Sequence, residues 1–595
     1  MSRTSRTPRT VAAGLAGLLG LASLTLIGAP ASYAVSSASQ SSASQKAPKA
    51  PKTVELQLLA INDLHGNLEP PTGSGGRVAT GGLLPPVGTA APQPVTVDAG
   101  GVAYLADHLD RLREGQANTL TVAAGDMVGA SPLISALFHD EPTIEALDLL
   151  GLDVTAVGNH EFDEGVDELL RLQEGGCHPT DGCQTGHTYE GAGFPYLAAN
   201  VVDRETREPI LPPYLVKNVN GVKVGFIGMT LEGTPDIVSQ AGIAGVAFLD
   251  EAETANRYVA ELQRKNVESI VVLLHEGATQ ARDPSSQNSL YNDCDNLNGP
   301  LVDIVNRFDD AIDVVVSGHT HQAYNCEGTS EIDGKLVTSA ASFGRIVTDL
   351  RLTLDKRTKD VVVAQADNVI VTRDSADPQL QKLVDFYKAK AAPLASRQVG
   401  QITESITRTG TDDTPLGNLI ADSQLAATSS PATGGAVAAF MNPGGVRADL
   451  TYATTPPATD PDGVVTYGEA FAVQPFANLL VTKTFTGQQV LDLLNQQVTL
   501  KRFLQPAGIT WSYGPAGTPV NPASVVIAGK PLDLAASYRI TMNSFLADGG
   551  DGFTVFKLGT GTLVGGIDLD AFTGYLESRT APVAPPATDR IRTTP

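Results

Sequence analysis

Positive charge is scarce in this chain. Its 595 residues include 41 lysines and arginines against 65 aspartates and glutamates, which gives a formal net charge of −24. A surface that binds a nucleic-acid backbone needs clustered cations, so the sequence argues against a nucleic-acid polymer as a partner. A small anionic ligand remains compatible with this charge, because a local cation site can outweigh the overall field.

Cysteine is also rare. The chain has four cysteines and no CxxC pair, which argues against a structural zinc site of that type. In an exported chain, four cysteines suggest two disulfides, and three connectivities are possible. Proximity in the sequence favours Cys177 with Cys183, and Cys294 with Cys326.

Long apolar runs are confined to the N-terminus. Three arginines within the first nine residues precede an uncharged apolar stretch at residues 11–29, and small residues follow at 32–34. This pattern predicts a signal peptide over residues 1–34, cleaved after Ala34, and then a flexible linker over residues 35–52. An uncleaved anchor is the alternative, since the run approaches spanning length. No later stretch could span a membrane, so we expect a secreted protein, extracellular or in the cell envelope.

The rest of the chain is too long for one ordinary core and shows no internal repeat, so two domains are expected. Residues 53–373 alternate strand-like apolar runs with helical patterns, which indicates α/β layers. The strand-like runs lie at 54–61, 119–124, 153–157, 222–228, 269–274, 312–317 and 347–354, and the helical patterns include 102–114 and 254–265. Residues 70–98, rich in Gly, Pro and Ala, interrupt this alternation as a surface insertion.

A second α/β unit is expected over residues 397–582. Apolar residues at helical spacing in 376–392 predict a helix within the joining segment 374–396. The second unit itself has helical patterns at 416–427 and 487–498. Residues 583–595 are expected to be a frayed tail.

Five short motifs place Asp, Asn or His at or near the ends of strand-like runs. They read DLH, GD, GNHE, HE and GHTH, and they begin at residues 63, 125, 158, 275 and 318. Open α/β sheets bind ligands at the carboxyl ends of their strands, and carboxylate, amide and imidazole ligands suit a pair of divalent ions. The predicted metal ligands are Asp63, His65, Asp126, Asn159, His275, His319 and His321.

Each motif alone is modest evidence, and three of them have an ordinary structural explanation. Asp63 could be a surface aspartate, His275 a structural histidine, and His160 with Glu161 a polar helix start. Their joint occurrence in order argues against chance. Asp126 is the candidate bridging ligand, because a carboxylate after a buried strand needs a partner and can serve two ions. Asp163 can orient the imidazole of His160, which makes that pair a candidate catalytic dyad.

The second unit carries a different set of candidates. Glycines 444 and 445 let a ligand approach the turn at residues 442–449, and Arg447 can clamp a phosphate there. Phe476 and Phe545 could sandwich a nucleobase, although core packing is the alternative for each ring. Asp551, within GGDGF, could accept hydrogen bonds from a ribose diol.

The segments INDLHGN, AAGDMVGASP, AVGNHEFDEG, LLHEG and SGHTHQ resemble the motifs of the calcineurin-like metallophosphatases. In detail they are similar to the branch of 5′-nucleotidases and UDP-sugar hydrolases, over residues 54–580. The resemblance implies an N-terminal four-layer α/β-β/α sandwich and a C-terminal α/β nucleotide-binding domain, joined by a helix. It also implies that this C-terminal domain rotates to carry nucleotide to the metals, with a hinge expected near 376–392.

The resemblance also implies roles for individual residues. It assigns the first metal to Asp63, His65, Asp126 and His321, and the second to Asp126, Asn159, His275 and His319. A metal-bound water or hydroxide would attack phosphorus, with His160 and Asp163 as the catalytic dyad. The nucleotide pocket would comprise Asn442, Arg447, Phe476, Phe545 and Asp551.

Two positions depart from the family pattern. Pro443 stands where a glycine is common, and the phosphate-binding arginine that some members carry before the L-G-N helix is missing. Arg408 is the candidate to replace the missing arginine. Whether it can do so determines which phosphates the pocket can bind.

The leading hypothesis is a secreted enzyme that hydrolyses nucleoside 5′-monophosphates to nucleoside and phosphate with two divalent ions, whether Mn, Zn, Fe or Co. UDP-sugar hydrolysis and 2′,3′-cyclic nucleotide hydrolysis are alternatives on the same metals. A thiosulfate-ester hydrolase would leave the two stacking rings without a role. A non-catalytic nucleotide-binding surface protein would be expected to lack a ligand or the dyad, and none is missing. The native metals, the preferred base and the oligomeric state stay open.

Overall fold

The computed structural model describes residues 52–71, 73–83, 94–238, 242–280, 291–327, 332, 334–454, 460–476, 478–515 and 518–594. The predicted signal peptide lies outside these residues, as does all but the last residue of the predicted linker. Across the described ranges, no helix combines the length and apolarity needed to cross a bilayer.

Residues 52–396, here called the first lobe, contain two six-stranded sheets. One has the strand order β18-β17-β1-β4-β5-β6 and the other β15-β16-β14-β11-β9-β8. The first sheet comprises β1 (Thr53–Ile61), β4 (Thr119–Ala124), β5 (Val154–Ala156), β6 (Tyr196–Leu197), β17 (Ile346–Asp355) and β18 (Val361–Ile370). The second comprises β8 (Tyr214–Val219), β9 (Val222–Thr230), β11 (Ser269–His275), β14 (Val314–Ser317), β15 (Ala323–Glu327) and β16 (Leu336–Ala340). All seven predicted strand runs are confirmed.

Strand β1 shows why these runs are almost wholly apolar. Leu56 and Leu58 pack in a core that includes residues of both sheets, whereas Leu59 and Ile61 pack in a core shared with helices. Successive side chains of a strand point to opposite faces, so a strand covered on both faces has no solvent side.

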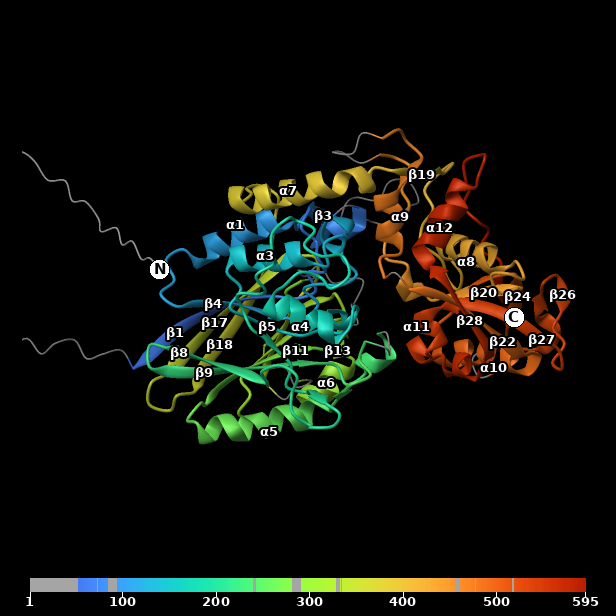
Figure 1. Cartoon of the computed structure of the whole chain (residues 1–595). Helices are drawn as coiled ribbons and strands as arrows, with labels where there is room; N and C mark the ends of the chain where they lie inside the picture. Colours follow the sequence, from blue (N-terminus) through green and yellow to red (C-terminus); the bar gives the residue numbers. More distant parts are fainter. Residues whose placement is uncertain are drawn as a thin grey trace, which may run out of the picture. The chain divides into compact units, whose positions relative to one another are not determined.

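Helices cover the outer face of each sheet. The core on the first sheet includes residues of α1 (Val102–Arg113), α3 (Glu141–Leu150), α4 (Val166–Glu174) and α7 (Pro378–Ala395). The core on the second sheet includes residues of α5 (Glu251–Arg264) and α6 (Pro300–Val305). Figure 1 shows α1, α3 and α7 along one side of the sheets and α5 along the other. The first lobe is therefore the predicted four-layer sandwich.

Smaller elements complete the first lobe. In the predicted surface insertion, β2 (Arg77–Leu83) pairs antiparallel with β3 (Pro94–Asp98). The remaining short elements are α2 (Leu133–Ala136), β7 (Val201–Asp203), β10 (Val246–Phe248), β12 (Thr279–Gln280) and β13 (Leu297–Asn298). Disulfides join Cys177 to Cys183 and Cys294 to Cys326, which confirms the expected pairing.

The predicted joining helix is α7. It begins after Asp377, whose carboxylate accepts hydrogen bonds from the amides of Gln379 and Leu380. Its buried residues Val384 and Tyr387 belong to the same core as α1 and α3. Bending within this helix would open that core, and the hinge expected near 376–392 stays a prediction.

Residues 398–594, here called the second lobe, contain a mixed five-stranded sheet, β23-β20-β27-β22-β28, and a four-stranded sheet, β26-β25-β24-β29. Their strands are β20 (Ala438–Met441), β22 (Leu479–Thr486), β23 (Gln505–Ala507), β24 (Ile509–Tyr513), β25 (Val526–Ile527), β26 (Lys530–Pro531), β27 (Ser537–Asn543), β28 (Thr560–Ile567) and β29 (Ile591–Thr593). Strands β19 (Gln398–Gln401) and β21 (Val464–Thr466) pair separately. The helices are α8 (Pro415–Thr428), α9 (Tyr467–Val473), α10 (Gly487–Leu500), α11 (Ser544–Ala547) and α12 (Asp568–Glu577).

The end of the chain differs from the expected frayed tail. Strand β29 pairs in parallel with β24, with Ile591 opposite Trp511. The guanidinium of Arg590 binds both carboxylate oxygens of Asp422 at 2.7 Å. The composition of residues 583–595 is typical of a loop, so the sequence gives no sign of these long-range contacts.

Candidate functional site

The predicted metal ligands lie at or just beyond the carboxyl ends of five strands from both sheets of the first lobe. Asp63 follows β1, Asp126 follows β4, and Asn159 follows β5. His275 is the last residue of β11, and His319 and His321 follow β14. The structure brings the aspartates and histidines among them into overlapping clusters, in which possible ligand atoms lie within 4.8 Å of one another.

Backbone strain is concentrated in these loops. Five of the predicted ligands have positive φ, namely Asp63 (51°), His65 (47°), Asp126 (53°), His319 (70°) and His321 (56°). Gly125 also has positive φ, and a Cβ there would lie 2.6 Å from the amide nitrogen of Gly158. Non-glycine residues in this region carry a conformational cost and collect at functional sites.

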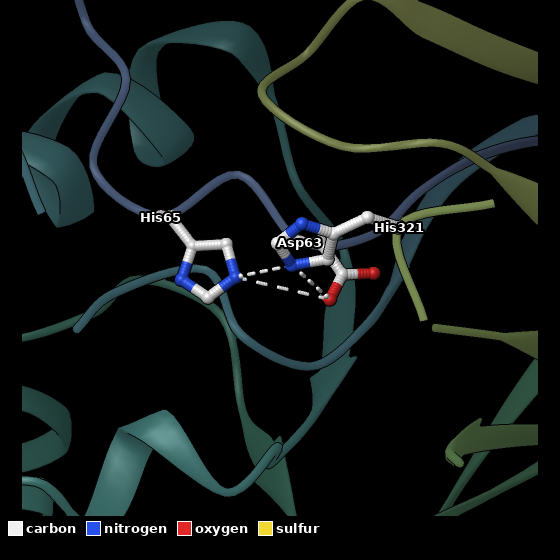
Figure 2. Close-up of side chains that lie close together, drawn as sticks. All are labelled: Asp63, His65 and His321. Atoms are coloured by element: carbon white, nitrogen blue, oxygen red, sulfur yellow. Dashed lines mark hydrogen bonds and ion pairs between the residues drawn. The ribbon is translucent and has the colours of Figure 1, made fainter. Parts of the chain in front are cut away.

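One cluster joins Asp63, His65 and His321, whose side chains point toward one another in Figure 2. The Nε2 atoms of the two histidines lie 3.0 Å apart. Nε2 of His321 lies 3.4 Å from Oδ1 of Asp63, and Nε2 of His65 lies 3.8 Å from it. Three converging ligand atoms of this kind can surround one small ion.

A second cluster joins Asp126, His275 and His319. Oδ2 of Asp126 lies 3.0 Å from Nε2 of His275 and 3.6 Å from Nε2 of His65. Asp126 thus faces histidines of both clusters with the same oxygen, as a bridging carboxylate would.

Hydrogen bonds to backbone carbonyls fix the tautomers of two of these histidines. Nδ1 of His65 lies 2.9 Å from the carbonyl oxygen of Gly129, and Nδ1 of His275 lies 2.8 Å from that of Ala124. A carbonyl only accepts hydrogen bonds, so each Nδ1 carries the proton. Both rings therefore direct Nε2 toward Asp126, which is the orientation of a metal-ligating histidine.

The residues present fit divalent cations. Oδ1 of Asn159 is buried and makes no hydrogen bond, although such atoms usually have a partner, and Nε2 of His275 faces only the Asp126 carboxylate, at 3.0 Å. Burial raises the pKa of Asp63 to about 7. Burial opposes protonation of His275, but the Asp126 carboxylate outweighs it and raises the pKa of His275 to about 10. Cations would satisfy the orphaned oxygen and stabilise the ionised carboxylates together.

His160 and Asp163 form the predicted pair beside this cluster. Nδ1 of His160 lies 2.8 Å from Oδ2 of Asp163, so the carboxylate holds the ring with Nε2 directed elsewhere. The backbone amide of His160 donates to Oδ1 of Asp126 at 2.9 Å. Burial alone would lower the pKa of His160, but Asp163 and Asp126 outweigh it and raise the pKa.

Glu161 is a residue of the site that the sequence interpretation missed. Its buried carboxylate accepts hydrogen bonds from the amides of Asp126 (2.9 Å), Met127 (2.8 Å) and Gly158 (2.5 Å). It thereby ties the loop after β4 to the loop after β5. The GNHE spacing was visible in the sequence, but the amide donors of the other loop were not.

Residues of both lobes line one cavity of about 280 Å³. The first lobe contributes Asn159, His160, Asp163 and His319, and the second contributes all five predicted pocket residues, Asn442, Arg447, Phe476, Phe545 and Asp551. The ring of Phe476 stacks on that of His160, with centroids 5.6 Å apart and planes inclined by 15°. The cavity also includes Arg502, Asn478 and Asn543, none of which the sequence analysis singled out.

Arg447 and Arg408 have different surroundings. The guanidinium of Arg447 lies 5.7 Å from the centroid of Phe476. Burial lowers the pKa of Arg447, while the carboxylates of Asp126 and Asp163 raise it. Arg408 instead binds Asp449 through Nε at 3.1 Å and donates to the carbonyl of Arg447 at 2.8 Å. Arg408 therefore supports the loop and does not line the cavity as a second phosphate ligand.

Comparisons with known proteins agree with this arrangement. Residues 56–323 match the calcineurin-like phosphoesterase family, and residues 398–558 match the 5′-nucleotidase C-terminal domain. The chain is 32% identical to the endonuclease YhcR of Bacillus subtilis over 557 residues, which are 91% of this chain but only 41% of that protein. It is 32% identical to the cell wall protein Lmo0130 of Listeria monocytogenes over 564 residues, 89% of this chain and 68% of that protein.

A solved structure shares both lobes. The 5′-nucleotidase precursor from Thermus thermophilus is 27% identical, with a TM-score of 0.69 over 91% of this chain and 99% of that one. The order of the two matched families along the chain is the order of the two lobes. The chain belongs to the 5′-nucleotidase branch of the calcineurin-like phosphoesterases and is a metal-dependent phosphoric ester hydrolase.

Proposed function

We propose that this protein hydrolyses nucleoside 5′-monophosphates to nucleoside and phosphate, using two divalent ions in the first lobe. The observation that carries the proposal is the shared cavity. His160 and His319 of the first lobe line it together with Arg447, Phe476 and Phe545 of the second lobe. A nucleotide that is stacked on the second lobe would then present its phosphate to the metal clusters. We further propose that residues 1–34 direct the protein out of the cell.

The donor sets suggest how the ions would be held. One ion would bind Asp63, His65, Asp126 and His321, and the other would bind Asp126, Asn159, His275 and His319, with Asp126 shared. When bound, the ions would supply Lewis-acid activation of water and of the phosphoryl group.

The chain's own residues would do the rest. Arg447 would bind the non-bridging phosphate oxygens through its guanidinium fork. Asp163 would accept from Nδ1–H of His160 and favour the imidazolium form of the ring, whose Nε2–H can give its proton to the ribose oxygen as it leaves phosphorus. Phe476 and Phe545 would hold the base, and Asp551 would accept from the ribose diol.

The test is hydrolysis of AMP to adenosine and phosphate, of UDP-glucose to UMP and glucose 1-phosphate, and of 2′,3′-cyclic AMP to an adenosine monophosphate. Each reaction is followed with the chain starting at residue 35, before and after metal removal and return. The proposal predicts Mn²⁺-restored release from AMP that collapses in His160→Ala. Restored hydrolysis of UDP-glucose or the cyclic nucleotide alone would replace the substrate and keep the mechanism. No turnover of any of the three, with ions bound, would favour a non-catalytic nucleotide-binding protein.

A further inference from the structure

Arg502 enters the cavity because helix α10 ends with a left-handed residue. Lys501 caps the helix with φ of 51°, and the amide of Arg502 then turns back to donate to the carbonyl of Gln497 at 3.1 Å. The side chain of Arg502 is 51% exposed and lines the cavity together with Asp551. A charged, half-exposed side chain placed in this way is available to a ligand or to a neighbouring carboxylate.

Asp551 is the partner of Arg502. Nη1 of Arg502 donates to Oδ1 of Asp551 at 2.5 Å, and the Asp551 side chain is only 14% exposed. Asp551 lies between two glycines and has φ of 57°. This backbone conformation sets the direction in which its side chain leaves the main chain. Asn442 also hydrogen-bonds the Asp551 side chain and in turn accepts from Asn543 at 2.9 Å. All four side chains line the same cavity.

The two arginines of the cavity act on different charges. The charged neighbours of Arg447 include Asp63, Asp126 and Asp163 of the first lobe. Within the described part of the chain, Arg502 is the one charged group that perturbs Asp551, and it counteracts the rise in the pKa of that carboxyl caused by burial. Arg447 thus lies under the influence of the predicted metal ligands, and Arg502 lies beside Asp551.

We propose that Arg502 is a positioning residue that gives this pocket its preference for ribonucleosides, by holding Oδ1 of Asp551 so that Oδ2 accepts from the ribose hydroxyls. The proposal rests on the proposed function, which places a nucleoside in this cavity. An ionised carboxylate accepts from both hydroxyls of a diol, whereas a protonated or rotated carboxyl loses part of that capacity. Without Arg502, Asp551 would lack its charged partner.

The test is binding of adenosine and of 2′,3′-dideoxyadenosine to the chain starting at residue 35, measured by calorimetry. We expect the unaltered protein to prefer adenosine by about 10–100-fold, the range of hydrogen bonds to a charged group. Arg502→Gln should reduce this preference to about threefold while leaving dideoxyadenosine affinity unchanged, and Arg502→Lys should restore part of it. Arg592→Gln is the matched control, because it removes an exposed arginine that pairs with Asp589 at 3.0 Å outside the cavity.

Two results would overturn the inference. One is an equal loss of affinity for both nucleosides in Arg502→Gln, which indicates a general structural role. The other is an unchanged preference in a variant whose thermal unfolding is normal. AMP hydrolysis, measured in parallel, separates the two proposals: ribose preference that depends on Arg502 without phosphate release would sink only the hydrolytic function. Absence of any nucleoside binding would sink both.

Discussion

The metal clusters of the first lobe and the nucleotide pocket of the second satisfy their polar groups in opposite ways. Five predicted metal-ligand positions have positive φ, and Oδ1 of Asn159 is buried without a hydrogen bond. Among the pocket residues that the structure describes in the second lobe, only Asp551 has positive φ among the non-glycines, and none has an orphaned buried polar atom. The first site depends on ions from outside, whereas the second is completed by its own side chains.

Because of this difference, mutations in the two lobes are expected to change different measured properties. Changes in the first lobe should alter metal content and turnover while nucleoside binding persists. Changes in the second lobe should alter KM and specificity while the ions stay in place. A change that moves both sets of readouts would break the comparison.

The largest effect is expected from Asp126→Asn. The amide removes the charge that faces His65 and His275, so metal affinity should fall by more than the roughly 10–100-fold that follows loss of a group that only orients a ligand. Phosphate release should fall with it, and adenosine binding should stay within about threefold. Metal content by elemental analysis and adenosine binding by calorimetry are the measurements, and loss of both together would contradict the separation.

Glu161→Gln should lower metal affinity by roughly 10–100-fold. Glutamine has one accepting oxygen and one amide nitrogen that cannot accept, so the variant loses either the bond from Met127 or the bonds from Asp126 and Gly158, and the anchor between the two ligand-bearing loops is weakened. Asp568→Asn is the matched control, because Asp568 is also buried and accepts a backbone amide, from Leu569 at 2.8 Å, in the second lobe. If the two substitutions lowered metal affinity equally, the loss would come from introducing any buried side-chain amide and not from the hydrogen bonds of Glu161.

Phe545→Ala should raise KM for AMP with kcat nearly unchanged. Stacking of a base on an aromatic ring contributes about 1–3 kcal/mol, which corresponds to about 5–150-fold in KM. Ribose 5-phosphate lacks the base, so its kcat/KM should not change in the variant. A comparable loss for ribose 5-phosphate would place Phe545 in the core and not in the pocket.

Asp313→Asn should raise thermal stability by about 2–4 °C at pH 8, and by less at pH 5. Burial raises the pKa of Asp313 to about 8, so between pH of about 4 and 8 the folded state holds a proton that the unfolded chain releases. Stability therefore falls as pH rises through this window, and asparagine removes that loss while its carbonyl oxygen still accepts from Ile270. The exposed Asp310→Asn is the control in thermal unfolding, and an equal gain at both pH values would refute the assignment.

Strands β1, β4, β9, β11 and β14 could be predicted because each is largely buried and reads as a nearly unbroken apolar run, whereas the more exposed β8 and β18 were missed. The predicted ligands are brought together because parallel strands end at a common edge, so order along the sequence becomes proximity in space. Their assignment to particular ions stays a prediction.

Other features depend on contacts between distant segments. Glu161 accepts from amides more than thirty residues away, and Arg502 pairs with Asp551, which lies 49 positions further along the chain. No local pattern marks either partner. Strand β29 was missed for the same reason, because its pairing with β24 brings together residues 591–593 and 511–513.

The most direct test of this account is a titration of metal-stripped protein with Mn²⁺, in which bound metal and phosphate release from AMP are followed together. The account predicts that release rises until two ions are bound per chain and then levels off. Full release with one ion bound, or two bound ions without release, would contradict it.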